Sequence, residues 1–310
     1  MTSDAAIAAG SVTQPKSGSN RFGDVVPTSV VVGVILIVWY IATIPMNRVV
    51  AETRIAAAGS GWWNTLAVSW SLDRPVIPAP HQVLIGFWNT VFAVDPTTPR
   101  SLVYHAWVTL TPTLLGFALG SLLGVVLAVA IVHMRTLQKS LLPWIIASQT
   151  IPILAIAPMI IVVLGSVGLT GILPKSLISM YLCFFPVAIG MVKGLTSPEV
   201  MQLDLMHTYN ASAAQTLWKL RFPAALPFLF ASLRVAISIA LVGAIVGELP
   251  TGAQAGIGAR LLTGSYYGQT VQIWAALLAA ALMAGGLVWA VGAVEKVTNR
   301  LMGARPEPVA

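Results

Sequence analysis

The sequence predicts an all-α membrane protein with about six transmembrane helices. Its 310 residues are 57% hydrophobic and only 9% charged, whereas a typical soluble domain carries roughly 25% charged residues. So few charges cannot cover the surface of a water-soluble domain. The net charge of +7 comes from basic residues scattered between apolar runs, as in membrane proteins. The composition therefore predicts a lipid bilayer as partner and no nucleic acid.

Six apolar runs are long enough to span a bilayer, because a spanning helix needs roughly 20 such residues. They are residues 25–46, 106–132, 141–164, 172–195, 226–248 and 271–294. Residues 1–24 predict a disordered tail, and residues 303–310 a second tail. In the less apolar stretch 47–105, "PAPHQVLIGFWNTVFAV" predicts an amphipathic helix. The first run is too long for a signal peptide and is expected to remain as an anchor.

Basic residues in the short loops predict the orientation. If Lys16 and Arg21 lie in the cytoplasm, six spans also place "HMRTLQKS", residues 193–221 and the C-terminal tail there. The short outer loops then carry only Lys175 and Arg260. We therefore expect both termini in the cytoplasm.

Small residues lie at helical spacing in two spans. Gly116, Gly120 and Gly124 share one helix face, and Gly243 and Gly247 repeat the pattern. Such faces let another helix approach closely, either within the subunit or from a second one. The single cysteine, Cys183, lies among apolar residues, which predicts a packed thiol and excludes a disulfide framework or multi-cysteine metal site.

The third span combines prolines with polar side chains. The prolines are Pro143, Pro152 and Pro158. Each removes a backbone hydrogen bond, which is tolerated only where protein or a water-filled cavity satisfies the freed carbonyl groups. Ser148, Gln149 and Thr150 lie beside these breaks and are expected to face the bundle interior. A role in a translocation pathway and structural hydrogen bonding both remain open.

Glu248 and Tyr181 complete the candidate pathway residues. Glu248 ends the fifth span in "VGELP", and a carboxylate near membrane depth is a functional candidate. Equally, it can lie at the outer interface and cap a neighbouring helix. Together with Gln149, Thr150 and Tyr181, it would suit a hydrogen-bonding solute.

The polar stretch 197–225 predicts two short helices joined by a tight turn. Ser197 can cap a helix that begins at Pro198 and runs to about Tyr209, and Asn210 can end it in the left-handed conformation.

The second short helix begins at Ser212, whose "SAAQ" forms a capping box with Gln215, and it lasts until Pro223. A DNA-binding helix-turn-helix is excluded because the stretch is not basic enough and membrane spans flank it.

"ASAAQTLWKLRFPAALPFLFASLRVAISIAL" resembles the EAA loop of the inner-membrane permeases of bacterial ABC importers, in particular the nitrate/sulfonate/taurine-type branch. Four further blocks agree in order: "PAPHQVL", "TLTPTLLGFALGSLLGVVLAVA", "QTIPILAIAPMIIVVLGSVGLTGILPKSLISMYLCFFPVAIGMVKGL" and "GELPTGAQAGIGARLL". The similarity covers roughly residues 25–302. It implies the MetI-like fold of type I importer permeases, with cytoplasmic coupling helices.

The resemblance implies that residues 197–225 contact a separate ATPase subunit. The coupling residues that it implies are Asp204, Tyr209, Asn210, Ala211, Ser212, Gln215 and Pro223. Asn210 stands where the family usually has Gly, which suits a left-handed turn. Asp204 replaces the usual Glu, and Leu205 and Met206 replace paired alanines, so the choice of ATPase is left open.

No catalytic residue, metal site or cofactor is predicted in this chain. "GLTGILPKS" lacks the Gly before Lys175 that a phosphate-binding loop requires, so ATP and Mg²⁺ are expected on the partner ATPase. The resemblance also implies a second permease copy or paralogue, an extracytoplasmic solute-binding protein and the bacterial inner membrane. The solute would be a small polar compound of the nitrate, sulfonate, taurine or pyrimidine-like class.

Two other classes fit the sequence less well. A secondary transporter often shows internal repeats and intramembrane charge pairs, and the sequence indicates neither. A membrane enzyme would need a motif such as HExxH or GxSxG, or a pair of intramembrane carboxylates, and these are absent.

Overall fold

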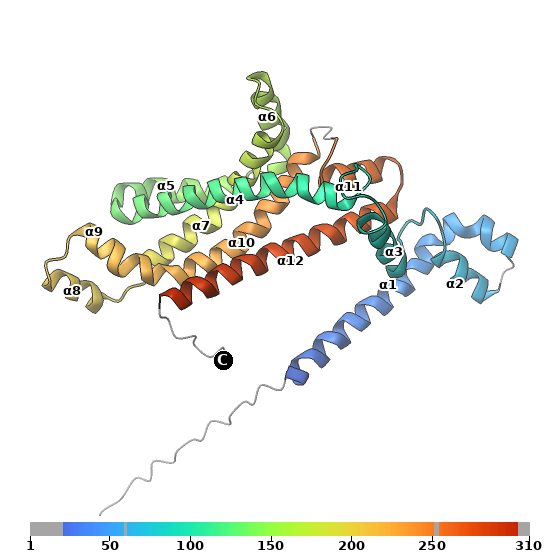
Figure 1. The fold of residues 1–310 in the computed structure, drawn as a ribbon, viewed down its shortest axis with the longest axis horizontal. Helices are drawn as coiled ribbons and strands as arrows, with labels where there is room; N and C mark the ends of the chain where they lie inside the picture. The colour runs from blue at the N-terminus through green and yellow to red at the C-terminus, as the bar shows by residue number, and fades with distance from the viewer. Residues whose placement is uncertain (1–20, 59–60, 251–253, 303–310) are drawn as a thin grey trace, which may run out of the picture. The chain divides into compact units, whose positions relative to one another are not determined.

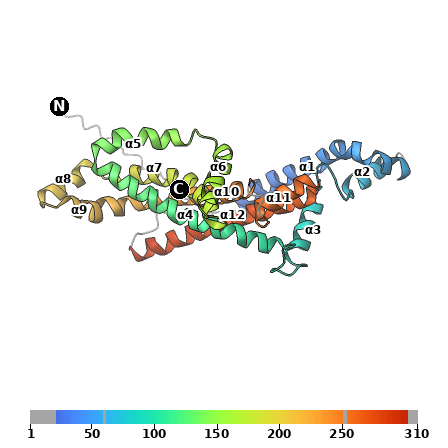
Figure 2. The ribbon, with the colours of Figure 1, turned by 90° about the horizontal axis from the view of Figure 1, so that it is seen from above.

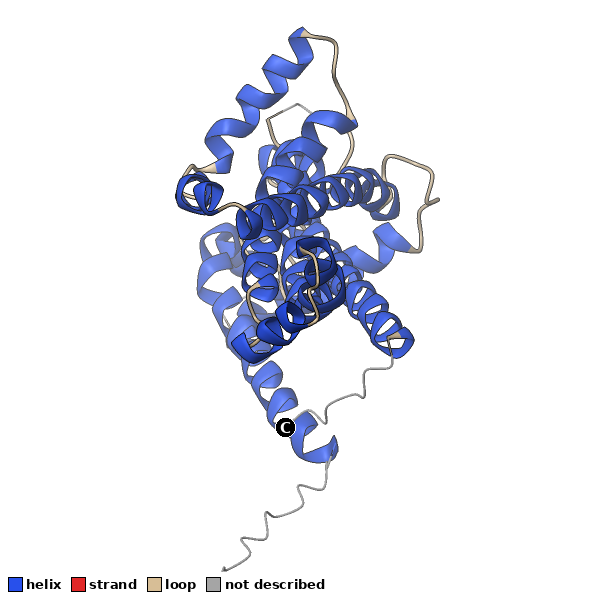
Figure 3. Ribbon diagram, turned by 90° about the vertical axis from the view of Figure 1, so that its left-hand side faces the viewer, coloured by secondary structure: helices blue, strands red, loops and turns tan. Residues whose placement is uncertain are grey.

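The computed structural model describes residues 21–58, 61–250 and 254–302, and Figure 3 shows helices and loops but no strand among them. They belong to two compact units, Met1–Trp70 and Ser71–Ala310. The prediction of an all-α protein is confirmed for this part of the chain. Residues 1–20 and 303–310 of the predicted tails lie outside the described residues. Residues 21–24 are helical, so the expected tail 1–24 was too long.

The first unit pairs α1 (Arg21–Ala58) with α2 (Trp62–Trp70). The Trp70 indole donates to the Thr43 hydroxyl at 3.1 Å, and the Asn47 amide donates to the Ser69 carbonyl at 3.2 Å. The apolar span of α1 covers Val26–Glu52. The predicted end at Met46 was therefore too early, and the polar Asn47 just beyond it is buried with its amide bonded to α2.

Three long helices form the centre of the second unit: α4 (Leu102–His133), α7 (Ile172–Leu195) and α10 (Phe222–Glu248). They lie side by side in Figures 1 and 2. Small and branched apolar residues at their contacts, among them Ala128, Val187 and Ala236, are fully buried. The predicted span 172–195 coincides with α7. The predicted span 106–132 lacks the first turn of α4, where the Ser101 side chain accepts a hydrogen bond from the Val103 backbone at 3.2 Å.

The glycines of α4 face α7 of the same subunit. A Cβ atom at Gly124 would lie 2.8 Å from the Phe184 carbonyl oxygen and 2.9 Å from Val187 Cβ. On α10, a Cβ at Gly243 would lie 2.8 Å from Ser179 Cα. Close packing within one subunit thus accounts for both patterns. The buried Cys183 thiol packs in the same contact, which confirms the packed thiol.

The third predicted span is broken. It consists of α5 (Arg135–Ser148) and α6 (Ile153–Ser166), bent by 98° at residues 149–152. Pro152 immediately precedes α6 and cannot continue the backbone hydrogen bonds of α5. The predicted break beside Ser148, Gln149 and Thr150 is confirmed, while α5 begins at Arg135, before the predicted start at residue 141. The described residues contain five helices long and apolar enough to cross a membrane, or six if the bent pair is one span.

The remaining helices are α3 (Pro80–Val91), α11 (Ile257–Tyr266) and α12 (Thr270–Leu301). The expected helix in "PAPHQVLIGFWNTVFAV" is confirmed as α3. Both α3 and α11 pack on α12, and Figures 1 and 2 show them near its first turns. The predicted span 271–294 underestimates α12, which continues through the charged residues Glu295, Lys296 and Arg300.

Candidate functional site

A sharp turn joins α8 (Val200–Thr208) to α9 (Ala213–Thr216) at one end of the second unit (Figure 1). The Asn210 N–H donates to the His207 carbonyl at 2.9 Å, and the Ala211 N–H donates to the Met206 carbonyl at 3.0 Å. This pair of bonds is a Schellman motif. Asn210 has a φ of 49°, which confirms its predicted left-handed conformation.

The capping box at the start of α9 is also confirmed. The Ser212 hydroxyl accepts from the Gln215 N–H at 3.3 Å, and the Gln215 side chain accepts from the Ser212 N–H at 2.9 Å. Two backbone donors that would otherwise lack partners are satisfied reciprocally. The turn between α8 and α9 is thus fixed on both sides by local hydrogen bonds.

Two predictions about this loop were wrong. Ser197 does not cap α8, because its hydroxyl donates to the Gly194 carbonyl at 2.7 Å, and Glu199 occupies the N-cap instead. The second helix does not end at Pro223. It passes through a π-helical turn, η1 (Leu217–Arg221), into α10, so that Ala213–Glu248 forms one spanning helix. A bond from the Phe222 N–H to the Leu217 carbonyl shifts the hydrogen-bond register just before the proline.

The α8–α9 end exposes large apolar side chains. We call this set the α8–α9 patch: Val200, Met201, Leu205, Tyr209 and Trp218. Tyr209 is 77% exposed. Of the residues implied by resemblance, Asp204, Asn210, Ser212 and Gln215 are also exposed, while Ala211 and Pro223 are partly buried. Sequence reasoning missed Val200, Met201 and Trp218, because an apolar residue gives no sign in the sequence that its side chain is exposed.

Four predicted pathway residues lie together at the break between α5 and α6. The Tyr181 hydroxyl, from α7, donates to the Ser148 carbonyl. The hydroxyls of Ser148 and Thr150 donate to backbone carbonyls three residues earlier, at 2.7 Å each, and the Gln149 amide reaches the Ser148 hydroxyl at 3.4 Å. The contacts thus provide structural hydrogen bonding at the broken span.

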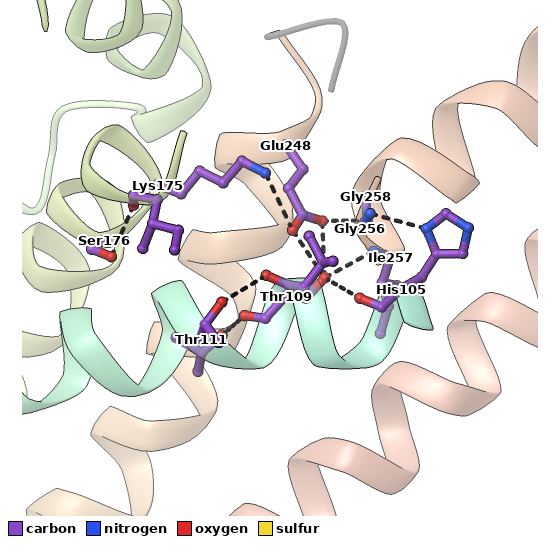
Figure 4. A network of polar contacts seen from close by, with 12 residues as sticks. His105, Thr109, Thr111, Lys175, Ser176, Glu248, Gly256, Ile257 and Gly258 are labelled. Atoms are coloured by element: carbon purple, nitrogen blue, oxygen red, sulfur yellow. Dashed lines mark hydrogen bonds and ion pairs between the residues drawn. The ribbon is translucent and has the colours of Figure 1, made fainter. Parts of the chain in front are cut away.

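Glu248 lies in a separate network that connects four helices (Figure 4). Its carboxylate accepts from the Thr109 hydroxyl of α4 at 2.9 Å and from the Gly258 N–H in the first turn of α11 at 2.8 Å. The Lys175 ammonium of α7 lies 3.8 Å away. Glu248 is 0% exposed. This geometry matches the alternative in which Glu248 caps a neighbouring helix.

His105 and Thr109 hold the start of α11 from the other side. The His105 Nδ1 accepts from the Gly256 N–H at 3.0 Å, while Nε2 lies 2.9 Å from the Pro99 carbonyl. A ring that accepts at one nitrogen and donates at the other is neutral. The Thr109 hydroxyl oxygen also accepts from the Ile257 N–H at 2.8 Å. The sequence did not single out either residue, because their partner lies about 150 positions away.

Two ion pairs join long apolar helices, although the sequence indicated no charge pair within the spans. Lys175 and Glu248 form a buried pair, and Arg234 of α10 forms a second pair with Glu295 of α12. The Arg234 side chain is 47% exposed. Each pair joins helices distant in sequence, so the partners could not be matched from sequence alone.

Comparisons with known proteins agree with this architecture. The family described as "Binding-protein-dependent transport system inner membrane component" matches residues 120–302. A "Probable ABC transporter permease protein" of Haemophilus influenzae is 33% identical over 70% of this chain and 83% of its own. The chain belongs to this family. It is thus an ABC transporter permease, a multi-pass transport subunit and not an enzyme.

Other relatives of the permease differ in their solutes. The "Formylaminopyrimidine transport permease protein ThiX" of Halalkalibacterium halodurans is 30% identical over 62% of this chain and 75% of its own. The "Taurine transport system permease protein TauC" of Escherichia coli is 27% identical over 66% of this chain and 73% of its own. The resemblance to the taurine-type branch is confirmed. Family membership implies ATPase and binding-protein partners in general terms.

Proposed function

We propose that the permease forms the pathway of an ATP-driven importer for a small polar solute, and that its α8–α9 end docks on the ATPase. The observation that carries this proposal is the rigid turn at Asn210, presented among the exposed apolar side chains of the α8–α9 patch. An exposed apolar group of this kind marks a protein interaction site. The coupling residues proposed are Asp204, Tyr209, Asn210, Ala211, Ser212, Gln215 and Pro223.

The helix that leaves the turn supports a mechanical role. It continues from Ala213 to Glu248, and 36 residues of helix span roughly 54 Å. Near its start, the Arg221 guanidinium donates to the Leu195 carbonyl at the end of α7 at 3.3 Å. At its far end, Glu248 contacts α4, α7 and α11. A displacement at the turn would therefore move α7 and α10 together and reach the network around Glu248.

The proposed orientation places the α8–α9 end and both termini in the cytoplasm and the α11 end outside. A second permease copy or paralogue would complete the pathway, and an extracytoplasmic binding protein would deliver the solute. ATP and Mg²⁺ would bind to the ATPase and not to this chain. The relatives' solutes, formylaminopyrimidine and taurine, support a small polar compound of the nitrate, sulfonate, taurine or pyrimidine-like class.

The polar residues at the α5–α6 break are the proposed pathway residues: Ser148, Gln149, Thr150 and Tyr181. Backbone carbonyls freed at a helix break can line an aqueous path, and Thr150 is exposed there. The buried Glu248 is proposed to act on the pathway only through the helices that it joins.

Replacing Asn210 tests the coupling role. Asn210→Pro cannot adopt the φ of 49° because proline fixes φ near −65°, whereas Asn210→Gly keeps the left-handed turn at little cost. In proteoliposomes with the ATPase and binding protein of the same transporter, we expect Asn210→Pro to abolish uptake and its stimulation of ATP hydrolysis. Asn210→Gly should retain both. Equal coupled ATPase activity in the two variants would show that this loop is not the coupling element.

A further inference from the structure

A cavity of about 330 Å³ lies at the opposite end of the second unit from the α8–α9 patch. The segment before α3, α3 itself, α11 and the first turns of α12 surround it. Its polar lining consists of Asp73, Arg74, Thr90, Arg260, Gln269 and Gln272. None of these is among the proposed coupling or pathway residues.

Two hydrogen-bond donors of this lining have no partner in the part of the chain that the structure describes. Among the described residues, four buried side-chain nitrogen or oxygen atoms lack a hydrogen bond, and two of them are Arg260 Nε and Gln272 Nε2. A buried donor without a partner costs about 1–3 kcal/mol, and such groups usually indicate a bound water, ion or ligand. Two unpartnered donors in one cavity indicate a ligand that supplies hydrogen-bond acceptors.

The charge of the lining specifies the ligand further. Within the part of the chain that the structure describes, neither Arg260 nor Arg74 has a carboxylate within ion-pair distance. Among the described residues, the one acceptor of Arg260 is the Arg100 carbonyl, at 3.3 Å, and Asp73 has a partner of its own. Burial lowers the pKa of Arg260, because desolvation disfavours its charged form. An opposite charge in the cavity would offset that cost.

We propose that this cavity binds a small oxyanion, such as a sulfonate, carboxylate or phosphate group. Arg260 and Arg74 supply the positive charge, and the Gln272 amide supplies a further donor. The first turn of α12 adds the positive end of its helix dipole. The cavity is larger than one such group, so it has room for a small organic substituent attached to the oxyanion. The site is independent of which solute the permease carries.

Calorimetric titration of the purified, delipidated permease tests this site. We use methanesulfonate as the probe and dimethyl sulfone, its neutral isostere, as the matched control. Methanesulfonate should bind and dimethyl sulfone should not. Arg260→Gln should weaken binding about tenfold or more, because it removes a charge-assisted hydrogen bond. Gln272→Leu should also weaken it.

Arg100→Gln is the matched control variant, because it removes the same charge close by without changing the lining. It should bind methanesulfonate as the unchanged protein does. The melting temperature of each variant shows that it remains folded. Absence of methanesulfonate binding, equal binding of dimethyl sulfone, or equal weakening by Arg100→Gln and Arg260→Gln would overturn the proposal.

A second arm identifies the source of the oxyanion. In nanodiscs of phosphatidylcholine or phosphatidylglycerol, a site that holds a lipid phosphate would lose the methanesulfonate binding seen in delipidated protein. A site for a free solute would keep it. Because both results presuppose oxyanion binding, a failure of the titration would leave the coupling test at Asn210 unaffected.

Discussion

Glu248 shows how one buried carboxylate can define the end of a helix bundle. Among its contacts are the Gly258 N–H, the Thr109 hydroxyl and the Lys175 ammonium. Every one of them lies on a different helix. A Cβ atom at Gly256 would overlap the Glu248 carboxylate, so a glycine is required where the chain enters α11. These partners supply hydrogen bonds and an opposite charge in place of water, which lowers the cost of burying the carboxylate.

Removing either partner of the buried Lys175–Glu248 pair should lower the free energy of unfolding. Glu248→Ala leaves the Lys175 charge and the Gly258 N–H without partners, and loss of one partner of a buried ion pair costs about 3–5 kcal/mol. Lys175→Met should cost a similar amount. The measurement is thermal or denaturant unfolding of the purified permease in detergent.

The double variant Lys175→Met/Glu248→Gln separates a structural role from direct solute binding. Because it leaves no buried charge, it should be more stable than the sum of the two single changes predicts. It should also retain transport if Glu248 acts only by joining helices. Additive losses of stability would contradict the pairing of these two residues.

At the scale of elements, glycines set how closely α4 and α7 approach. Gly116, Gly120 and Gly124 all face α7, and each would place a Cβ inside van der Waals contact with it. The contact is therefore made by backbone atoms, which cannot rotate away as a flexible side chain can. This close packing places Thr109 and Lys175 near the same carboxylate.

Gly124→Ala should destabilise the permease by about 1–3 kcal/mol, the usual cost of overpacking. Its added methyl would meet the Phe184 carbonyl oxygen at 2.8 Å and the Ala188 backbone nitrogen at 3.0 Å. Gly286→Ala in α12 is the matched control, since no heavy atom lies within 4 Å of its Cβ position. In thermal unfolding of the isolated subunit, Gly124→Ala should have a lower midpoint than Gly286→Ala. Equal midpoints would show that α4 and α7 do not pack through this face.

At the scale of the molecule, the second unit has two chemically different ends. One exposes the α8–α9 patch. The other contains the Glu248 network and the donor-lined cavity. The continuous helix Ala213–Glu248 reaches from one end to the other. A movement of the α8–α9 patch would therefore displace the helix that carries Glu248.

The proposed orientation predicts which end each side of the membrane can reach. In a Cys183→Ala background, Ser212→Cys and Tyr267→Cys place single thiols at the two ends, and both positions are exposed. A membrane-impermeant thiol reagent added to intact spheroplasts should label Tyr267→Cys only. Permeabilised spheroplasts should allow labelling of both. Labelling of Ser212→Cys from outside would reverse the orientation.

Local patterns predicted a large part of this structure. The turn at Asn210 and the capping box of Ser212 and Gln215 were predicted correctly, because their bonds connect residues three to five positions apart. The fourth span was predicted to the residue. Helix ends were less accurate, because Ser197 and Glu199 compete for the cap of α8 and only the surrounding contacts decide between them. Pro152 marked a break, but not the 98° bend.

The sequence by itself determined the class of the protein, its long apolar helices and the turn between α8 and α9. Hydrophobicity, proline positions and capping depend on neighbours along the chain. The tertiary structure alone decided that Glu248 pairs with Lys175 and caps α11, that Arg234 pairs with Glu295, and that Arg260 and Gln272 share a cavity. These contacts form only when helices distant in sequence pack together, so no local pattern encodes them.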